Sequence, residues 1–467
     1  MDPNANPRAP STEQLKQLLC GALDQIGVLQ AKVAELRAQL GQDSSNSSRP
    51  PSTDLPGANP TKPRPTGRKR GGQPGHEGAK RPVLKPDRVI DHRPESCDKC
   101  AHKLAGDDAN PSRWQVFELP AILPHVTEHR AHTLTCSRCA AETTAVLPTD
   151  VLQHGFGPRM TALVAYLTGR CRLSKRQVAE FFEEALGTPI SVGAVCALEQ
   201  DMSAALAGPY DEAAAVMQTR PVVNADETGW REDKKIAWLW VAVTDLAIVF
   251  RVARGRGKAV ARELLGEHFA GLLVTDRWSA YNWVESIRRQ LCWSHLIRDF
   301  QGMVDRGGVG GTLAAEILVE AAKMMNWWHR VCDGGLGRKT FQELMVPVRA
   351  EVGRLLRDAE ARAEPKTAGM CKEMRKLEAA LWTFVTIEGV GPTNNAAERA
   401  VRPPVLWRKG SFGNDSAAGS RFAERILTAV ATVRLREGSV LGYLAEACSS
   451  YRATRTAPSF LTVARVG

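Results

Sequence analysis

Apolar residues repeat every seven positions near the N-terminus. One series consists of Leu19, Ile26, Val33 and Leu40, and a second consists of Leu15, Ala22, Leu29 and Leu36. Four heptads of this kind predict a coiled coil over residues 12–41, through which the chain associates with another copy. An amphipathic helix packed on its own chain is the alternative interpretation.

The next segment, residues 42–94, has no apolar periodicity and is rich in Ser, Pro and Gly. Between Ser44 and Pro94 it contains eleven Lys or Arg against four Asp or Glu. Such a segment cannot bury a core, so we expect a disordered linker. Its basic cluster includes Arg68, Lys69 and Arg70, which are candidates for binding DNA phosphates. A solvated linker without a ligand is the alternative.

Residues 95–148 contain two Cys-x-x-Cys pairs, Cys97–Cys100 and Cys136–Cys139. Each pair is a tight turn that presents two thiolates, and the two pairs together supply the four ligands of a structural Zn²⁺ site. Because the pairs are far apart in the sequence, we expect strands between them, at residues 114–119 and 125–129. Two reduced cysteine pairs in a core are the alternative.

Helical periodicity dominates residues 150–220. Ser174 precedes one predicted helix, Gly187 and Pro189 interrupt the pattern, and Ser191 precedes a second helix. A helix, a glycine-containing turn and a helix are typical of a helix-turn-helix that binds DNA. An ordinary helical hairpin has the same pattern.

From residue 221 the pattern changes to that of a mixed sheet flanked by helices. The predicted strands are 221–226, 236–243, 247–252, 271–276 and 290–293, and the predicted helix among them is 258–265. Residues 301–390 are almost wholly helical and interrupt this domain. We therefore expect one α/β domain built from residues 221–300 and 391–445, followed by a C-terminal tail, 446–467.

Three acidic residues lie at the ends of these elements. Asp226 and Asp276 each end a predicted strand, and Glu398 lies at the start of a predicted helix. Carboxylates are preferred ligands of Mg²⁺ and Mn²⁺, and two such ions about 3.5–4 Å apart can catalyse phosphodiester cleavage. Two strand-end aspartates and a helical glutamate predict an RNase H-like site in which these three residues bind the metal ions.

Composition and charge favour a nucleic-acid partner in a reducing compartment. The 467 residues have room for roughly three domains, and the net charge of +11 favours a polyanionic ligand. The eleven cysteines are an odd number, which fits one zinc site better than a disulfide framework. No long apolar stretch or signal peptide is evident, so we expect a cytoplasmic protein without a membrane partner.

Further candidates surround the acidic residues. Four basic residues near Glu398 are candidates for holding DNA phosphates, with charge balance on a solvated helix as the alternative: Arg399, Arg402, Arg408 and Lys409. Trp230 and Trp278 are candidates for stacking on a base or for core packing. His295 is expected either near the metal site or in the core.

Several of these motifs together resemble a known family. They are Ser47–Ser52 (SSRPPS), Gly71–His76 (GGQPGH), the two Cys-x-x-Cys pairs, Asp226–Trp230 (DETGW), Cys292–His295 (CWSH) and segments of the 392–427 block. The chain resembles the bacterial insertion-sequence transposases of the IS-sixty-six family, specifically the large transposase subunit. The resemblance covers nearly the whole chain and is most specific over residues 392–427.

This resemblance implies a DDE catalytic triad at Asp226, Asp276 and Glu398. It also implies recognition of terminal inverted repeats and joining of the element's ends to target DNA. Family members are commonly encoded beside small accessory proteins. We therefore expect a multidomain α+β transposase that acts on double-stranded DNA as a homodimer or larger complex and is nucleoid-associated when bound.

The fold class expected is a coiled coil, a small zinc-binding domain, a helical DNA-binding region and an RNase H-like α/β catalytic domain with an all-helical insertion. Two other functions share parts of this prediction. A non-catalytic repressor would bind the element ends without cleavage, and an RNase H-like nuclease would cleave without strand transfer.

Overall fold

The computed structural model describes residues 81–148, 151 and 155–463, together with four positions between residues 22 and 29. The predicted coiled coil lies almost entirely outside the described residues, as do Arg68, Lys69 and Arg70 and most of the predicted linker. The chain forms two compact units, and each is considered separately. Among the described residues, the larger comprises 129–179 and 191–463, and the smaller comprises 81–128 and 180–190.

A five-stranded mixed sheet lies at the centre of the larger unit, with the strand order β5-β4-β3-β6-β7. Its strands are β3 (Val222–Glu232), β4 (Lys235–Val243), β5 (Ile248–Ala253), β6 (Leu272–Thr275) and β7 (Arg289–Leu291). The first three strands pair antiparallel, and β6 and β7 continue the sheet in parallel with β3. The mixed sheet expected from the sequence is confirmed.

The tight turn between β3 and β4 explains why these two long strands stay in register. Asp233 and Lys234 both have positive φ, 52° and 59°. This is the conformation of a two-residue hairpin loop, whose twist matches that of the flanking strands. Glu232 pairs with Lys235 directly across the turn, and the pairing continues to Asn224 and Val243.

Helices surround the sheet, and among the described residues they include those predicted from residue 150 onward. They are α3 (Pro158–Gly169), α4 (Lys175–Leu186), α5 (Val192–Ala205), α6 (Ala207–Gln218), α7 (Lys258–Leu265), α8 (Trp293–Arg306), α9 (Gly308–Cys332), α10 (Arg338–Arg362), α11 (Pro365–Lys376), α12 (Thr383–Thr386), α13 (Asn395–Ser411), α14 (Ala417–Leu435) and α15 (Val440–Thr454). Short 3-10 turns, η2 (Ser279–Tyr281), η3 (Ser286–Arg288) and η4 (Glu378–Leu381), join some of them. Helix α4 crosses the division between the two units.

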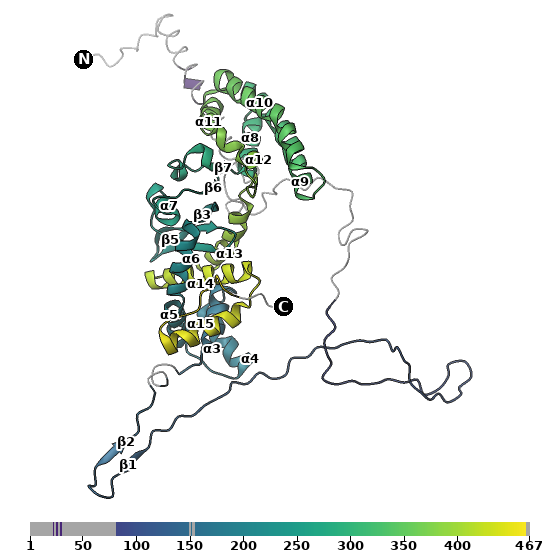
Figure 1. Ribbon diagram of the computed structural model, residues 1–467, viewed down its shortest axis with the longest axis vertical. Helices are drawn as coiled ribbons and strands as arrows, with labels where there is room; N and C mark the ends of the chain where they lie inside the picture. Colours follow the sequence, from purple (N-terminus) through teal and green to yellow (C-terminus); the bar gives the residue numbers. More distant parts are fainter. Residues whose placement is uncertain are drawn as a thin grey trace, which may run out of the picture. The chain divides into compact units, whose positions relative to one another are not determined.

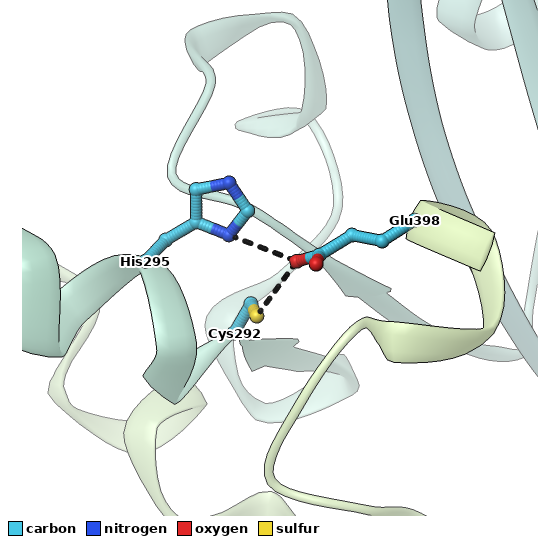
Figure 2. A group of neighbouring side chains, drawn as sticks. All are labelled: Cys292, His295 and Glu398. Carbon is cyan, nitrogen blue, oxygen red and sulfur yellow. Dashed lines mark hydrogen bonds and ion pairs between the residues drawn. The ribbon is translucent and has the colours of Figure 1, made fainter. Parts of the chain in front are cut away.

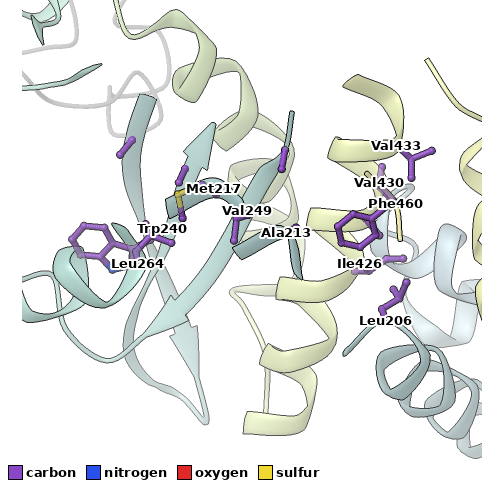
Figure 3. Close-up of a cluster of buried hydrophobic side chains, with 14 of the residues drawn as sticks. Leu206, Ala213, Met217, Trp240, Val249, Leu264, Ile426, Val430, Val433 and Phe460 are labelled. Carbon is purple, nitrogen blue, oxygen red and sulfur yellow. The ribbon is translucent and has the colours of Figure 1, made fainter. Parts of the chain in front are cut away.

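Buried apolar side chains form three clusters. The first joins one face of the sheet to α3, α5, α6, α7, α14 and α15 and includes Trp240, Ile426 and Phe460 (Figure 3). The second fills the helical insertion, where α9 and α10 run side by side (Figure 1). The third lies on the opposite face of the sheet, under α13 and α14. Helix α15 crosses the predicted boundary at residue 445, and Phe460 beyond it is fully buried.

Helix α14 covers the open edge of the sheet through its side chains. The backbone N–H groups of Ile248 and Phe250 on β5 donate to the hydroxyls of Thr432 and Thr428, both at 3.0 Å, and that of Val252 donates to Glu424 at 2.7 Å. Two residues along a strand cover nearly the same distance as four residues along a helix, so successive donors of β5 face successive side chains of α14. The unpaired donors of an edge strand are thereby satisfied, which prevents pairing with another chain.

The strands expected between the two cysteine pairs do not form. Residues 114–129 have no strand, and the short strands of this region are β1 (Thr133–Thr135) and β2 (Glu142–Thr144), which flank the second cysteine pair. Trp114 and Val126 are 86% and 81% exposed. A strand requires a backbone partner and a buried face, and these residues have neither, so that prediction was wrong. None of the helices that the structure describes has the length and apolarity to cross a bilayer.

Candidate active site

Strands β3 and β6 bring two of the predicted acidic residues to the same edge of the sheet. The two strands pair in parallel at Val222 with Leu272, and the register ends at Asn224 with Val274. Asp226 and Asp276 each follow the last pair by two residues. Asp276 follows the carboxyl end of β6, as predicted. Asp226 lies within β3, which continues to Glu232, so the prediction that Asp226 ends its strand was wrong. The parallel register nevertheless brings the two aspartates to the same level of the sheet.

Alternation along β3 directs Asp226 and its neighbour Glu227 to opposite faces of the sheet. Glu227 is buried on one face, where it accepts hydrogen bonds from Tyr281 at 2.7 Å and Arg256 at 2.9 Å. Asn224, on the same face as Asp226, contacts the segment at the start of α13. The Asp226 side chain thus lies on the face that α13 covers.

A tight turn holds Asp276. Its Oδ1 accepts a hydrogen bond from the backbone N–H of Trp278 at 2.9 Å. The buried guanidinium of Arg289 donates to the Asp276 carbonyl oxygen at 3.4 Å and to the Thr275 hydroxyl at 3.2 Å. The loop is therefore fixed by backbone contacts, which leaves a carboxylate oxygen of Asp276 available for a ligand.

Asn394 attaches the third acidic residue to the sheet. This side chain, only 1% exposed, donates to the carbonyl oxygen of Ala225 at 2.8 Å and accepts from the Asn224 amide at 3.0 Å. Helix α13 begins at the next residue, and Glu398 lies in its first turn. These two hydrogen bonds fix the start of α13 beside Asp226 and thereby position Glu398.

Cys292 and His295 lie directly against Glu398. The Sγ atom of Cys292 lies 3.7 Å from Oε1 of Glu398, and Nδ1 of His295 lies 3.4 Å from the same oxygen (Figure 2). Among the described residues this is the one group of three or more His, Cys, Asp or Glu whose ligand atoms all lie within 4.8 Å. The oxygens of Asp226, Asp276 and Glu398 do not meet that criterion as a set.

The electrostatics nevertheless link the three acidic residues. Burial raises the pKa of Asp226 well above its usual value, and the negative charges of Glu227, Asp276 and Glu398 raise it further. In the part of the chain that the structure describes, no lysine or arginine forms an ion pair with Asp226 or Asp276. Glu227 is paired with Arg256, whereas Asp226 and Asp276 have the charge that a bound divalent ion would neutralise.

The two neighbours of Glu398 are affected chiefly by burial. Burial raises the pKa of the Cys292 thiol to about 11. It also lowers the pKa of His295, and the positive charge of Arg298 lowers it further. His295 therefore lies near the acidic residues, one of the two positions left open by the sequence, and burial favours its neutral form.

The basic candidates on α13 have different environments. Arg399, Arg402 and Lys409 are exposed, whereas the half-buried Arg408 donates to the carbonyl oxygen of Gly229 at 2.8 Å. Burial lowers the pKa of Arg408. Arg408 thus joins α13 to β3, and the other three side chains stay free to meet a ligand.

Both candidate stacking tryptophans have intramolecular partners. Trp230 is 2% exposed, packs edge-on against Trp407 and donates to Asn414 at 3.0 Å, so its role is core packing. Trp278 donates to the carbonyl oxygen of Arg256, whose guanidinium lies 4.1 Å from its ring centroid. Arg256 and Asn394 were missed by the sequence analysis, although the Asn394-Asn395 pair was part of the most specific motif.

The two cysteine pairs form turns of the same geometry. The backbone N–H of Ala101 donates to the carbonyl oxygen of Cys97, and that of Ala140 donates to Cys136, both at 2.8 Å. The two alanines have φ of 55° and 57°. Backbone N–H groups of the following residues lower the pKa of Cys97 and of Cys136. One pair belongs to the smaller unit and the other to the larger, and their union in one Zn²⁺ site stays a prediction.

The sequence matches two protein-family models and one curated relative. A family model described as "Transposase IS66 family" matches residues 154–421, and one described as "Family of unknown function (DUF6444)" matches residues 4–82. A curated relative, "Uncharacterized protein y4qI" of Sinorhizobium fredii (strain NBRC 101917 / NGR234), is 27% identical over 237 residues, which cover 45% of this chain and 43% of the relative. The chain thus spans less than half of that relative's length. Since the transposase model matches more than half of the 467 residues, including Asp226, Asp276 and Glu398, the chain belongs to the IS66 family of transposases.

Proposed function

We propose that the chain is a DDE-type DNA transposase in which Asp226, Asp276 and Glu398 hold the catalytic metal ions. The observation that carries this proposal is the convergence of β3, β6 and the start of α13. It places Asp226 where Asp276 and Glu398 both raise its pKa. Family membership supports DNA as the substrate.

The residues fit Mg²⁺ or Mn²⁺. All three offer carboxylate oxygens, which these hard cations prefer. The Asp226 carboxylate is buried beside like charges and has no cationic partner among the described residues. When bound, two such ions would activate the attacking oxygen and stabilise the leaving one. Asp226 would hold both ions, with Asp276 and Glu398 completing one coordination sphere each.

We further propose that the domain is RNase H-like. The support is the strand order β5-β4-β3-β6-β7, in which three antiparallel strands are extended by two parallel ones. The first acidic residue lies on the central strand, the second follows the adjacent parallel strand, and the third lies on a helix across the sheet face. The helical insertion, with its own core, separates the second and third acidic residues in the sequence.

The reaction proposed has two steps on one site. Water first attacks a phosphodiester at the element end and leaves a 3′-hydroxyl. That hydroxyl then attacks a phosphodiester of the target strand, so one bond is exchanged for another without an external energy source. The exposed Arg399, Arg402 and Lys409 on α13 would bind strand phosphates close to Glu398. Arg408, which is committed to Gly229, would hold the helix rather than the DNA.

The four cysteines Cys97, Cys100, Cys136 and Cys139 are proposed to bind Zn²⁺. The matching turns and the lowered pKa of the first cysteine in each pair support this, because the ion binds thiolates. The zinc-binding domain, 95–148, and the helical region, 150–220, would recognise the terminal inverted repeats. The basic linker, 42–94, would bind DNA without sequence preference.

The N-terminal coiled coil, 12–41, would pair two protomers and therefore two element ends. A non-catalytic repressor or a nuclease without strand transfer would use parts of the same architecture.

A strand-cleavage assay on a duplex carrying one element end distinguishes these functions. The transposase is expected to give nicked ends and joined products with Mg²⁺ or Mn²⁺. Nicks without joined products would indicate a nuclease, and binding without cleavage would indicate a repressor. The matched control is Asp226→Asn, which is expected to preserve DNA binding and to abolish both products; retained cleavage in that variant would remove Asp226 from the site.

A further inference from the structure

We propose that Cys292, His295 and Glu398 form a binding site for a thiophilic divalent cation, with Zn²⁺ as the expected ligand. This site is distinct from the all-carboxylate site because it includes sulfur and nitrogen ligands. It shares Glu398 with that site. The proposal that the three residues bind Zn²⁺ does not depend on the proposed function. Only the expected inhibition by Zn²⁺ rests on the proposed function.

The two distances from Glu398 to the other ligand atoms match a tetrahedral ion, and all three atoms lie within 4.8 Å of one another. Zn²⁺ binds sulfur at about 2.3 Å, and imidazole nitrogen and carboxylate oxygen at about 2.0–2.1 Å. Tetrahedral geometry then requires the sulfur and oxygen to lie about 3.5 Å apart, and the nitrogen and oxygen about 3.3 Å apart. The corresponding distances are 3.7 Å from Cys292 to Glu398 and 3.4 Å from His295 to Glu398.

Two further observations indicate a ligand at this position. Nδ1 of His295 is buried and has no hydrogen-bond partner, although it points at Glu398 (Figure 2). A buried ring nitrogen left unpaired carries a free-energy cost that a bound cation would remove. In addition, the backbone N–H of Asn394 donates to Sγ of Cys292 at 3.2 Å. Such an outer contact orients a metal-binding sulfur and stabilises its thiolate.

The elements that carry the ligands are fixed before any ion binds. Cys292 and His295 lie at the N-cap and in the first turn of α8, three residues apart, so both side chains face the same direction. The backbone N–H of Trp293 donates to the carbonyl oxygen of Pro392 at 2.9 Å, which joins this turn to the segment before α13. The start of α13 is held in turn by Asn394. A site on two anchored helix starts needs little rearrangement to bind.

The ligand set determines which ion is preferred. A thiolate and an imidazole favour Zn²⁺ over Mg²⁺, which takes oxygen ligands and octahedral geometry. Three protein ligands leave one tetrahedral position open to water. The thiol proton of Cys292 is released to solvent when the ion binds. Because Oε1 of Glu398 faces Cys292 and His295, Zn²⁺ at this site would compete with the Mg²⁺ site for the Glu398 carboxylate and inhibit the Mg²⁺-dependent reaction.

Metal content tests the binding directly. The full-length protein and its Cys292→Ser and His295→Asn variants are equilibrated with Zn²⁺, passed through a desalting column and analysed for zinc per chain. The wild-type chain is expected to retain one more ion than either variant. Cys332→Ser and His329→Asn, which change an exposed cysteine and an exposed histidine on α9, are expected to match the wild type. Equal zinc content in wild type and both site variants, each folded by circular dichroism, would overturn the proposal.

Inhibition tests the consequence. With Mg²⁺ in excess, added Zn²⁺ is expected to inhibit strand cleavage by the wild type and by Cys332→Ser. Cys292→Ser should need more than about tenfold more Zn²⁺ for the same inhibition, since even outer contacts of a metal site change affinity 10- to 100-fold. An unchanged Zn²⁺ response would contradict the competition for Glu398. If no chain cleaves DNA with Mg²⁺, the proposed function fails, while the zinc content still decides this inference.

Discussion

The Asn394→Ala substitution isolates the contact that holds Glu398 at the sheet. Asn394 makes two side-chain hydrogen bonds, a buried one to the Ala225 carbonyl oxygen at 2.8 Å and a partly buried one from the Asn224 amide at 3.0 Å. Its side chain does not cap α13, so no helix-capping bond is lost. Alanine would leave the buried Ala225 carbonyl without this partner, at a cost of about 1–3 kcal/mol, and would add a smaller cost at the half-buried Asn224 amide. With partial entry of water we expect a destabilisation of about 2–4 kcal/mol.

Asn395, the adjacent residue, provides the matched control. It is exposed, so Asn395→Ala should change the free energy of unfolding by less than about 0.5 kcal/mol. Urea denaturation of both variants, followed by tryptophan fluorescence and circular dichroism, measures the difference. Since displacement of a catalytic group by about 1 Å can cost 10²-fold in rate, cleavage by Asn394→Ala should also fall by roughly that factor. If the two variants unfold with the same free energy, the attachment of α13 through Asn394 is refuted.

Three other substitutions test separate parts of the structure. Asp226→Asn removes a carboxyl group, and burial and like charges raise the pKa of that group above 3.8. Ionisation of such a group destabilises the folded chain, so in the absence of metal the variant should be more stable than the wild type at pH 8. This gain in stability should disappear below pH 3.8, where the carboxyl group is protonated in both folded and unfolded wild type. An equal difference in unfolding free energy at both pH values would contradict this. Thr428→Val leaves the Phe250 N–H without its hydrogen bond and should lower the free energy of unfolding by about 1–3 kcal/mol. The control Thr454→Val, at an exposed position, should have little effect. Equal effects of the two substitutions would refute the conclusion that α14 stabilises the edge strand β5. Cys97→Ser should lose zinc in elemental analysis and bind element ends more weakly in a gel-shift assay, and unchanged zinc would refute the four-cysteine site.

Local patterns in the sequence were sufficient to predict most elements of the larger unit. Alternating and continuous apolar runs gave β4 and β5, and helical periodicity gave α7 at the same residues, Lys258–Leu265. The apolar pattern within each segment shows which face of the strand or helix is buried, so these elements can be predicted from neighbouring residues alone. The same patterns failed at residues 114–129, where apolar side chains stay exposed and no strand forms. There, β-forming residues lack a partner strand, and the sequence cannot show that absence.

The acidic residues were predictable individually, but the contacts that position them were not. Asp226 and Asp276 follow apolar runs, which marks them as strand ends in the sequence. The Asn394 hydrogen bonds and the approach of Cys292 and His295 to Glu398 join residues about 100 or more positions apart. Pairings at such separations depend on tertiary packing. Arg408 illustrates the same point, because its hydrogen bond to Gly229 could not be predicted from its charge.

The role of α14 was also hidden from the sequence. Thr428 and Thr432 are β-branched residues within a helix, where they are ordinarily unfavourable. Their hydroxyls satisfy the open edge of β5. This explains two fully buried threonines that periodicity alone would assign to an imperfect apolar face.

The proposed mechanism requires that Asp226, Asp276 and Glu398 share catalytic divalent ions. The anomalous scattering of Mn²⁺, in crystals of the full-length protein bound to a duplex with an element end, would locate these ions. We expect anomalous difference peaks within bonding distance of the carboxylate oxygens of all three residues, and their loss in crystals of Asp226→Asn. Well-ordered DNA and side chains with no Mn²⁺ peak between them would contradict this mechanism.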